Sequence, residues 1–158
     1  MAKAKPIPDG YHAITPYIRV RGAADAIEFY KKAFGAEELC RMPGPGGTIM
    51  HAEIRIGDSI IMLGEESKEW NCPSPLSIGG TGAGLHLYVT DADAAFARAT
   101  GAGAKVKMPL ANMFWGDRYG AVTDPFGHEW SIGTHLEDLT TDEIARRGQI
   151  EMAKMAKG

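Results

Sequence analysis

Two histidines and a glutamate are the residues of this chain most suited to chemistry. His51 and Glu53 lie two residues apart in TIMHAEIRI at 48–56, so in a β-strand their side chains share one face. An imidazole beside a carboxylate can transfer protons near neutral pH. The same pair can also ligate a divalent metal, or simply be hydrogen-bonded within the sheet. His86, in LHLYVT at 85–90, is the third candidate for each of these roles.

Aromatic and charged residues crowd the segment WGDRYGAVTDPFGHEW at 115–130. In a strand Trp115, Asp117 and Tyr119 alternate with Arg118, so only one of the two sets can face a cavity, and the sequence leaves open which. Trp115 fits a core, a cavity wall or a stacking platform, and His128, just after the DPFG turn, is expected to be exposed.

Arginines are the residues best able to hold an anionic group. Arg19 and Arg118 can bind such a group, or they can pair with Asp117, Glu129 or Glu53, because an unpaired buried charge is unfavourable. The candidate ligand-binding residues are therefore Tyr17, Arg19, His51, His86, Tyr88, Trp115, Arg118, Tyr119 and Glu129.

The elements that must position these residues occur in two similar series. Strands show period-two alternation and helices an apolar stripe that ends at glycine. In the expected strand AITPYIRV, Ile14, Pro16, Ile18 and Val20 form the apolar face. The first series is a strand at 13–20, a helix at 23–34 and strands at 36–43, 48–56 and 59–64; the second is a strand at 85–90, a helix within 91–106 and strands at 104–110, 114–123 and 128–134.

The two series form an internal repeat, since Val20 and Val89 are 69 residues apart and Gly57 and Gly127 are 70 residues apart. A half of roughly 70 residues can hardly bury an adequate core alone, so two βαβββ halves side by side are expected to enclose a shared cavity. We divide the chain into an N-terminal arm at 1–12, a first module at 13–64, a linker or covering loop at 65–84, a second module at 85–135 and a C-terminal helical extension at 136–158.

The C-terminal extension has its own helix signals. Thr140 with Glu143 fits a capping box. A weak apolar stripe predicts that this helix packs on its own domain or on a partner subunit; the stripe is Ile144, Gly148, Met152 and Met155.

The repeat, together with AIEFYKKAFGAE, VTDPFGHEWSI and THLEDLTTDEI, resembles the vicinal oxygen chelate superfamily over residues 12–147. That superfamily includes glyoxalase I, extradiol dioxygenases and the fosfomycin- and bleomycin-resistance proteins, and the motifs look like its PhnB-like branch. The resemblance implies an α+β fold, in which two tandem βαβββ modules form a curled mixed sheet around a central cavity, followed by a C-terminal helix. It also implies a homodimer.

In the metalloenzymes of this superfamily, four inward positions hold a divalent ion through His, Gln or Glu. Carried onto this chain, those positions are Thr15, Met62, Gly84 and Ser131. None offers an imidazole or a carboxylate, so we expect no metal there and no cofactor. A displaced site made by His51, His86 and Glu53, or a pair of His135 and Glu137, is the alternative.

The composition of the chain argues against some classes of binding partner. The net charge of −3 gives no basic patch for nucleic acid. No run of 18 apolar residues is present, which argues against a membrane partner, and the start MAKAKPIPDG lacks the apolar region of a secretory signal. Cys40 and Cys72 show no metal-finger spacing and are expected to be free thiols in a cytoplasmic protein.

We therefore expect a glyoxalase/bleomycin-resistance-like homodimer that binds a small organic ligand between its modules, without a metal. The alternative is a lyase or isomerase of the glyoxalase type, either metal-independent with His51 or His86 as acid or base, or using the displaced metal site. A protein with a vestigial cavity and a purely structural or interaction role is the third possibility. The sequence leaves open whether the chain is an enzyme.

Overall fold

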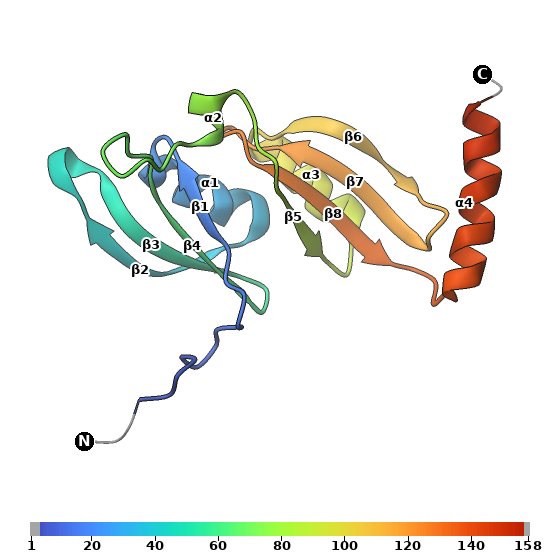
Figure 1. Ribbon diagram of the computed structural model, residues 1–158, viewed down its shortest axis with the longest axis horizontal. Helices are drawn as coiled ribbons and strands as arrows, with labels where there is room; N and C mark the ends of the chain where they lie inside the picture. Colours follow the sequence, from blue (N-terminus) through green and yellow to red (C-terminus); the bar gives the residue numbers. More distant parts are fainter. Residues whose placement is uncertain (1–3, 157–158) are drawn as a thin grey trace.

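The computed structural model describes residues 4–156 and contains two βαβββ modules followed by a helix (Figure 1). This is the expected α+β fold. The first module comprises β1 Tyr17–Val20, α1 Ala23–Phe34, β2 Glu37–Pro43, a 3-10 turn at Pro45–Gly47, β3 Ile49–Ile56 and β4 Ser59–Glu65. A connection with the short helix α2 Pro75–Ile78 leads to β5 Gly84–Tyr88, α3 Ala92–Ala102, β6 Lys105–Asn112, β7 Asp117–Thr123 and β8 Glu129–His135, and the chain continues into α4 Thr141–Met155.

Each module folds its strands into one four-stranded mixed sheet. The strand orders are β1-β4-β3-β2 and β5-β8-β7-β6, so the repeat seen in the sequence is a repeat of topology. In each sheet the first strand pairs in parallel with the last one, and the other pairs are antiparallel. This pairing sets Tyr17 opposite Met62 and His86 opposite Ser131.

Helices α1 and α3 cover one face of each sheet and pack against each other, so that the two sheets lie side by side (Figure 1). Gly35 ends α1 in the left-handed region at φ 68°, which glycine adopts without strain. The side chain of Arg98 in α3 donates hydrogen bonds to the carbonyls of Lys31 and Lys32 in the last turn of α1. The carbonyl of Lys31 also accepts from the amide of Gly35, so Arg98 adds a second donor at this helix end.

The core runs continuously through both modules between the helices and the sheets. A group of aromatic rings, 4.5–6.2 Å apart between centroids, packs in and against this core. These rings are contributed by both modules, so neither half has to bury a core alone. The group consists of Phe29, Tyr30, Phe34, Phe126 and Trp130.

The opposite face of each sheet is open. Tyr17 of β1 is 43% exposed and Tyr88 of β5 is 62% exposed, whereas Val20 and Ile132 on the helix-covered faces are fully buried. Large apolar side chains that are exposed together on one face of a sheet mark a surface that binds a ligand or another protein surface.

Two expectations about local structure are wrong. The first strand begins only at Tyr17, and Ile14 is 87% exposed instead of lying on an apolar strand face. Pairing with β4 starts where the Met62 amide donates to the Pro16 carbonyl, so the residues before Pro16 lie outside the ladder. His128 is buried, not exposed, and its Nε2 lies 2.8 Å from the carbonyl of Arg19 in the other module.

Helix α4 stands beside the end of the second sheet formed by β6 and β7 (Figure 1). The Thr140 half of its predicted capping box is confirmed, since the Thr140 hydroxyl accepts a hydrogen bond from the Glu143 amide. The Glu143 carboxylate is bound instead by Arg146 and Arg147. Gly148 is buried against Phe114, while Met152 and Met155 are exposed. No helix within residues 4–156 is long and apolar enough to cross a membrane.

Candidate functional site

The structure settles which residues of β7 face the open side. A side-chain carbon added to Gly120 would meet Phe96 of α3, so Gly120 and its neighbour of the same parity, Arg118, point to the helix side. The guanidinium of Arg118 is bound there by Asp93 through two hydrogen bonds of 2.6 and 2.7 Å. Tyr119 therefore belongs to the open face. The arginine pairing was expected, but its partner is Asp93.

His86 is the centre of an aromatic cluster on the open face of the second module. Its Nδ1 lies 2.6 Å from the hydroxyl of Ser131, the residue directly opposite in the parallel pair. The ring stacks on Tyr119 with centroids 5.8 Å apart and meets Tyr88 edge-on at 4.3 Å. Desolvation by these neighbours lowers the pKa of His86, which favours the neutral imidazole.

Asp117 holds the other polar groups of this face together. Its carboxylate is buried and accepts hydrogen bonds from the Trp115 indole at 3.2 Å, the Tyr88 hydroxyl at 3.3 Å and His135 Nδ1 at 2.7 Å. The hydrogen bonds of His135 to Asp117 and to Asp138 raise the pKa of His135. Trp115 is thus a supported wall residue with its polar end satisfied.

A second polar cluster lies on the open face of the first module. His51 Nδ1 is 2.9 Å from the hydroxyl of Tyr17, and its Nε2 is 3.1 Å from the carboxylate of Glu53. Tyr11, from the N-terminal arm, donates its hydroxyl hydrogen to Glu53. That bond raises the pKa of Tyr11 to about 12 and lowers the pKa of Glu53. The guanidinium of Arg19 lies 4.3 Å from the centre of the Tyr17 ring.

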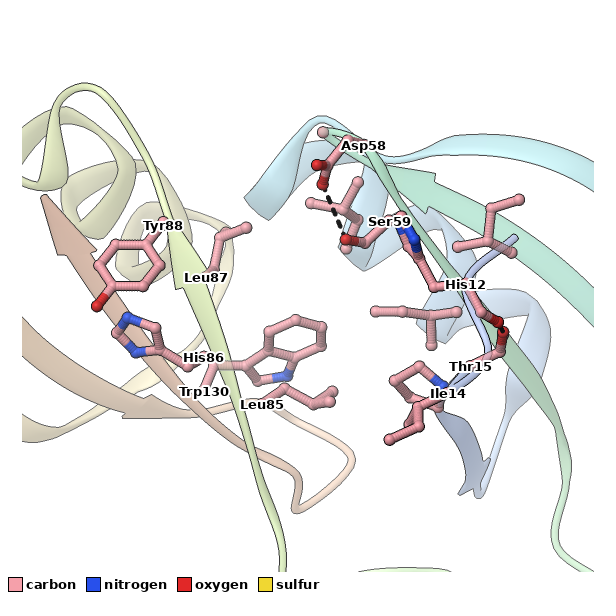
Figure 2. Close-up of a pocket in the computed structure, with 15 residues that line it drawn as sticks. His12, Ile14, Thr15, Asp58, Ser59, Leu85, His86, Leu87, Tyr88 and Trp130 are labelled. Atoms are coloured by element: carbon pink, nitrogen blue, oxygen red, sulfur yellow. Dashed lines mark hydrogen bonds between the residues drawn. The ribbon is translucent and has the colours of Figure 1, made fainter. Parts of the chain in front are cut away.

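A cavity of about 450 Å³ separates the two modules (Figure 2). Strand β5 forms one wall and the segment 12–16 with the β3–β4 turn forms the other. Leu85, Leu87 and Trp130 give it an apolar lining, and His86 and Tyr88 stand at its edge (Figure 2). Of the sequence candidates, His86 and Tyr88 therefore reach this cavity.

An adjoining cavity of about 410 Å³ takes in three further candidates, Tyr17, Arg19 and Glu129. Glu129 is paired with Lys107. The two cavities share Pro16 and Leu85 in their walls, so they adjoin along the gap between β1 and β5.

The four positions that hold the metal in related metalloenzymes do not fit a metal here. The Thr15 hydroxyl donates to the carbonyl of His12, Ser131 is engaged with His86, and Gly84 has no side chain. Met62 supplies only a thioether, which suits soft ions. No step of any reaction can be assigned to a metal at these positions.

The structure does not form the alternative metal sites in the way that the sequence predicted. His135 is bound by Asp117 and Asp138, and Glu137 pairs with Arg147, so His135 and Glu137 do not form a site. Within residues 4–156, the one group of three metal-ligating side chains close together consists of Cys40, His51 and Glu53, so it contains Cys40 in place of His86.

Sequence comparison agrees with this architecture. The family described as "Glyoxalase/Bleomycin resistance protein/Dioxygenase superfamily" matches residues 11–132. The chain belongs to this family.

Individual relatives are similar over most of their length. An uncharacterized protein of Mycobacterium tuberculosis is 47% identical over 135 residues, covering 84% of this chain and 79% of that protein. The crystal structure of TioX from Micromonospora is 27% identical with a TM-score of 0.61, covering 82% of this chain and all of TioX. The PhnB protein of Bacillus cereus, at 18% identity and a TM-score of 0.61 over 78% of this chain and 99% of that protein, shares the fold.

Proposed function

We propose that this protein binds a small organic molecule in the cavity between its two modules. The observation that carries the proposal is the cavity itself, of about 450 Å³, with an apolar lining of Leu85, Leu87 and Trp130 and with His86 and Tyr88 at its edge. Cavities of roughly 300–1,000 Å³ with apolar walls and a few convergent polar groups are the usual form of small-molecule sites.

The lining favours a planar, largely apolar ligand with a polar edge. The ring of Tyr88 is exposed beside His86 and offers aromatic surface on which a flat molecule can stack. The imidazole of His86 offers a hydrogen bond at the same edge. The family description includes bleomycin resistance proteins, and sequestration of a ligand requires only shape and polar complementarity.

A thermal-shift screen with planar aromatic and heteroaromatic compounds tests this function. A ligand at roughly 100 times its Kd stabilises the folded state by about 2.7 kcal/mol, which is several degrees in Tm for a domain of this size. We expect such shifts in the wild type and in Trp70→Ala, which removes an exposed aromatic outside the cavity. Tyr88→Ala should abolish them; equal shifts in all three proteins would place binding elsewhere.

A catalytic version of the same site is the second candidate. The lowered pKa of His86 keeps its imidazole neutral near pH 7, which is the form that accepts a proton. Its Nδ1 is fixed by Ser131, and the residue lines the cavity. This arrangement suits a base that removes a proton beside a carbonyl group, as a lyase or isomerase would.

Exchange of deuterium from solvent into the acidic carbon–hydrogen bonds of bound carbonyl compounds tests the catalytic version. His86→Gln should abolish the exchange while His135→Gln retains it. Binding without exchange in the wild type would leave sequestration as the function.

We also propose that the protein is a homodimer in which a second copy covers the open sheet faces. Tyr17, Met42 and Tyr88 are exposed on or beside these faces, together with apolar side chains of α4. Covering such surface is favourable by roughly 25 cal/mol per Å². Light scattering coupled to size-exclusion chromatography should give twice the 17.0 kDa chain mass, and a monomer at micromolar concentration would contradict this.

A further inference from the structure

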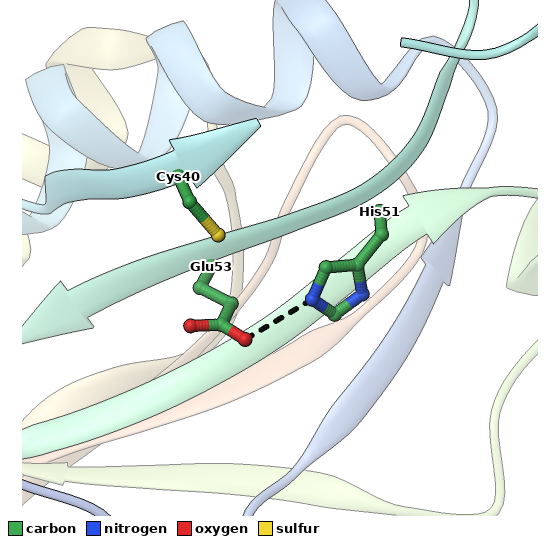
Figure 3. Close-up of side chains that lie close together, drawn as sticks. All are labelled: Cys40, His51 and Glu53. Atoms are coloured by element: carbon green, nitrogen blue, oxygen red, sulfur yellow. Dashed lines mark hydrogen bonds and ion pairs between the residues drawn. The ribbon is translucent and has the colours of Figure 1, made fainter. Parts of the chain in front are cut away.

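Strands β2 and β3 bring a cysteine, a histidine and a glutamate together on the open face of the first module (Figure 3). Cys40 is the direct partner of Glu53 in the antiparallel pair, so the two side chains share a face. His51 lies two residues before Glu53 on the same strand and shares that face too. One ligand atom from each residue lies within 4.8 Å of the other two.

We propose that Cys40, His51 and Glu53 bind a zinc-like divalent cation. A thiolate, an imidazole and a carboxylate are the three ligand types that zinc accepts, at roughly 2.0–2.3 Å. Ligands around a tetrahedral ion lie roughly 3.3–3.8 Å apart, and the three ligand atoms here lie within 4.8 Å of one another. Cys40 is exposed on the outer strand β2, so its side chain has the freedom to adjust to an ion.

The outer partners of such a site, which are the residues that hydrogen-bond to the metal-ligating side chains, are already in place. Ligating histidines usually hydrogen-bond through their second ring nitrogen, and ligating carboxylates are hydrogen-bonded as well. Here Tyr17 holds His51 through Nδ1, while Nε2 points to Glu53. Tyr11 holds Glu53 from the N-terminal arm. Tyr17 would accept the Nδ1 hydrogen once Nε2 binds the ion.

The site is displaced by one strand from the position used in related metalloenzymes. Met62 on β4 occupies that family position and is the direct partner of Glu53 on β3. The carboxylate therefore stands beside the thioether, on the side nearer to Cys40 and β2. The inference does not depend on the proposed ligand cavity, whose walls contain none of the three residues.

A nucleophilic cysteine is the competing interpretation of the same cluster. Reactive cysteines need a lowered pKa, which a nearby positive charge provides. Here the residue paired directly with Cys40 is Glu53, whose carboxylate is an anion and not a positive charge. A thiol, a carboxylate and an imidazole together are the ligand types of a zinc site.

Cobalt(II) titration of the untagged, reduced full chain tests the proposal, because cobalt reports thiolate ligation by absorbance. We expect one ion per chain, a thiolate-to-cobalt charge-transfer band and the intense visible bands of tetrahedral cobalt, all displaced by zinc. Cys40→Ser should abolish the charge-transfer band. His51→Gln should weaken binding by more than the roughly 10- to 100-fold that the loss of an outer partner costs.

Two further variants separate a metal site from general damage. Cys72→Ser removes the other free thiol, which lies outside the cluster, and should leave the cobalt spectrum and affinity unchanged. Tyr17→Phe should weaken binding by about 10- to 100-fold and retain the charge-transfer band. Circular dichroism confirms that each variant is folded. Absence of stoichiometric cobalt binding, or an unchanged charge-transfer band in Cys40→Ser, would overturn the proposal.

Discussion

The hydroxyl of Tyr30 donates a buried hydrogen bond of 2.8 Å to Oδ2 of Asp124, across 94 residues of sequence and between the two modules. Asp124 begins the DPFG turn, and its Oδ2 also accepts from the indole of Trp130 at 2.9 Å. Its Oδ1 accepts from the backbone amides of Phe126 and His128. These hydrogen bonds therefore attach the turn, and with it the second module, to helix α1.

Replacing Tyr30 by Phe should destabilise the protein by about 1–3 kcal/mol, because a buried carboxylate loses one of its donors. Urea unfolding measures this change. Tyr119→Phe, which removes a hydroxyl on the open face, is the matched control and should change stability by less. Equal losses in the two variants would contradict the role of Tyr30 as an inter-module contact.

The two histidines on the open face of the second module should titrate in opposite directions. Desolvation lowers the pKa of His86, and hydrogen bonds to Asp117 and Asp138 raise that of His135. Ring-proton NMR over a pH series, with resonances assigned through His86→Gln and His135→Gln, measures both values. His86 should titrate below about 6.5 and His135 above it. The reverse order would contradict the described environments.

The ion pair of His135 with Asp117 should make part of the stability depend on pH. The folded state raises the pKa of His135, so its contribution is fully present below about pH 6.5 and is lost as the pH rises through the raised value. The difference in unfolding free energy between wild type and His135→Gln should therefore be larger at about pH 5.5 than at about pH 9. A difference in unfolding free energy that increases with pH would contradict the raised pKa of His135.

The fold could be predicted from the sequence because its signals are local and occur twice. Alternating strands, glycine helix ends and the spacing of Val20 and Val89 define the βαβββ repeat, and the strand orders confirm it. The capping role of Thr140 is also local and was predictable.

Residues held by distant contacts were not predictable in this way. His128 follows a turn, where exposure is the usual outcome, but the junction with the first module buries it. Arg118 pairs with Asp93 at the start of α3, a contact that depends on how the helix packs on the sheet. The sequence alone does not show which side chains of β7 face the helices. The position of Gly120 against Phe96 of α3 shows it.

The metal cluster was only partly visible in the sequence. His51 and Glu53 stand out by their spacing, but Cys40 comes from the neighbouring strand. Its pairing with Glu53 cannot be counted across the turn at Pro45–Gly47, because the register between β2 and β3 shifts between Met42 and Pro43. Tyr11 was missed because the N-terminal arm has no periodic pattern.

The most direct test of the proposed function is electron density in crystals of the full chain soaked with the planar compounds that raise its Tm. We predict density between β5 and the segment 12–16, with a polar atom of the compound within hydrogen-bonding distance of His86. Compounds bound only outside this cavity, for example in the groove between α4 and Phe114, would contradict it.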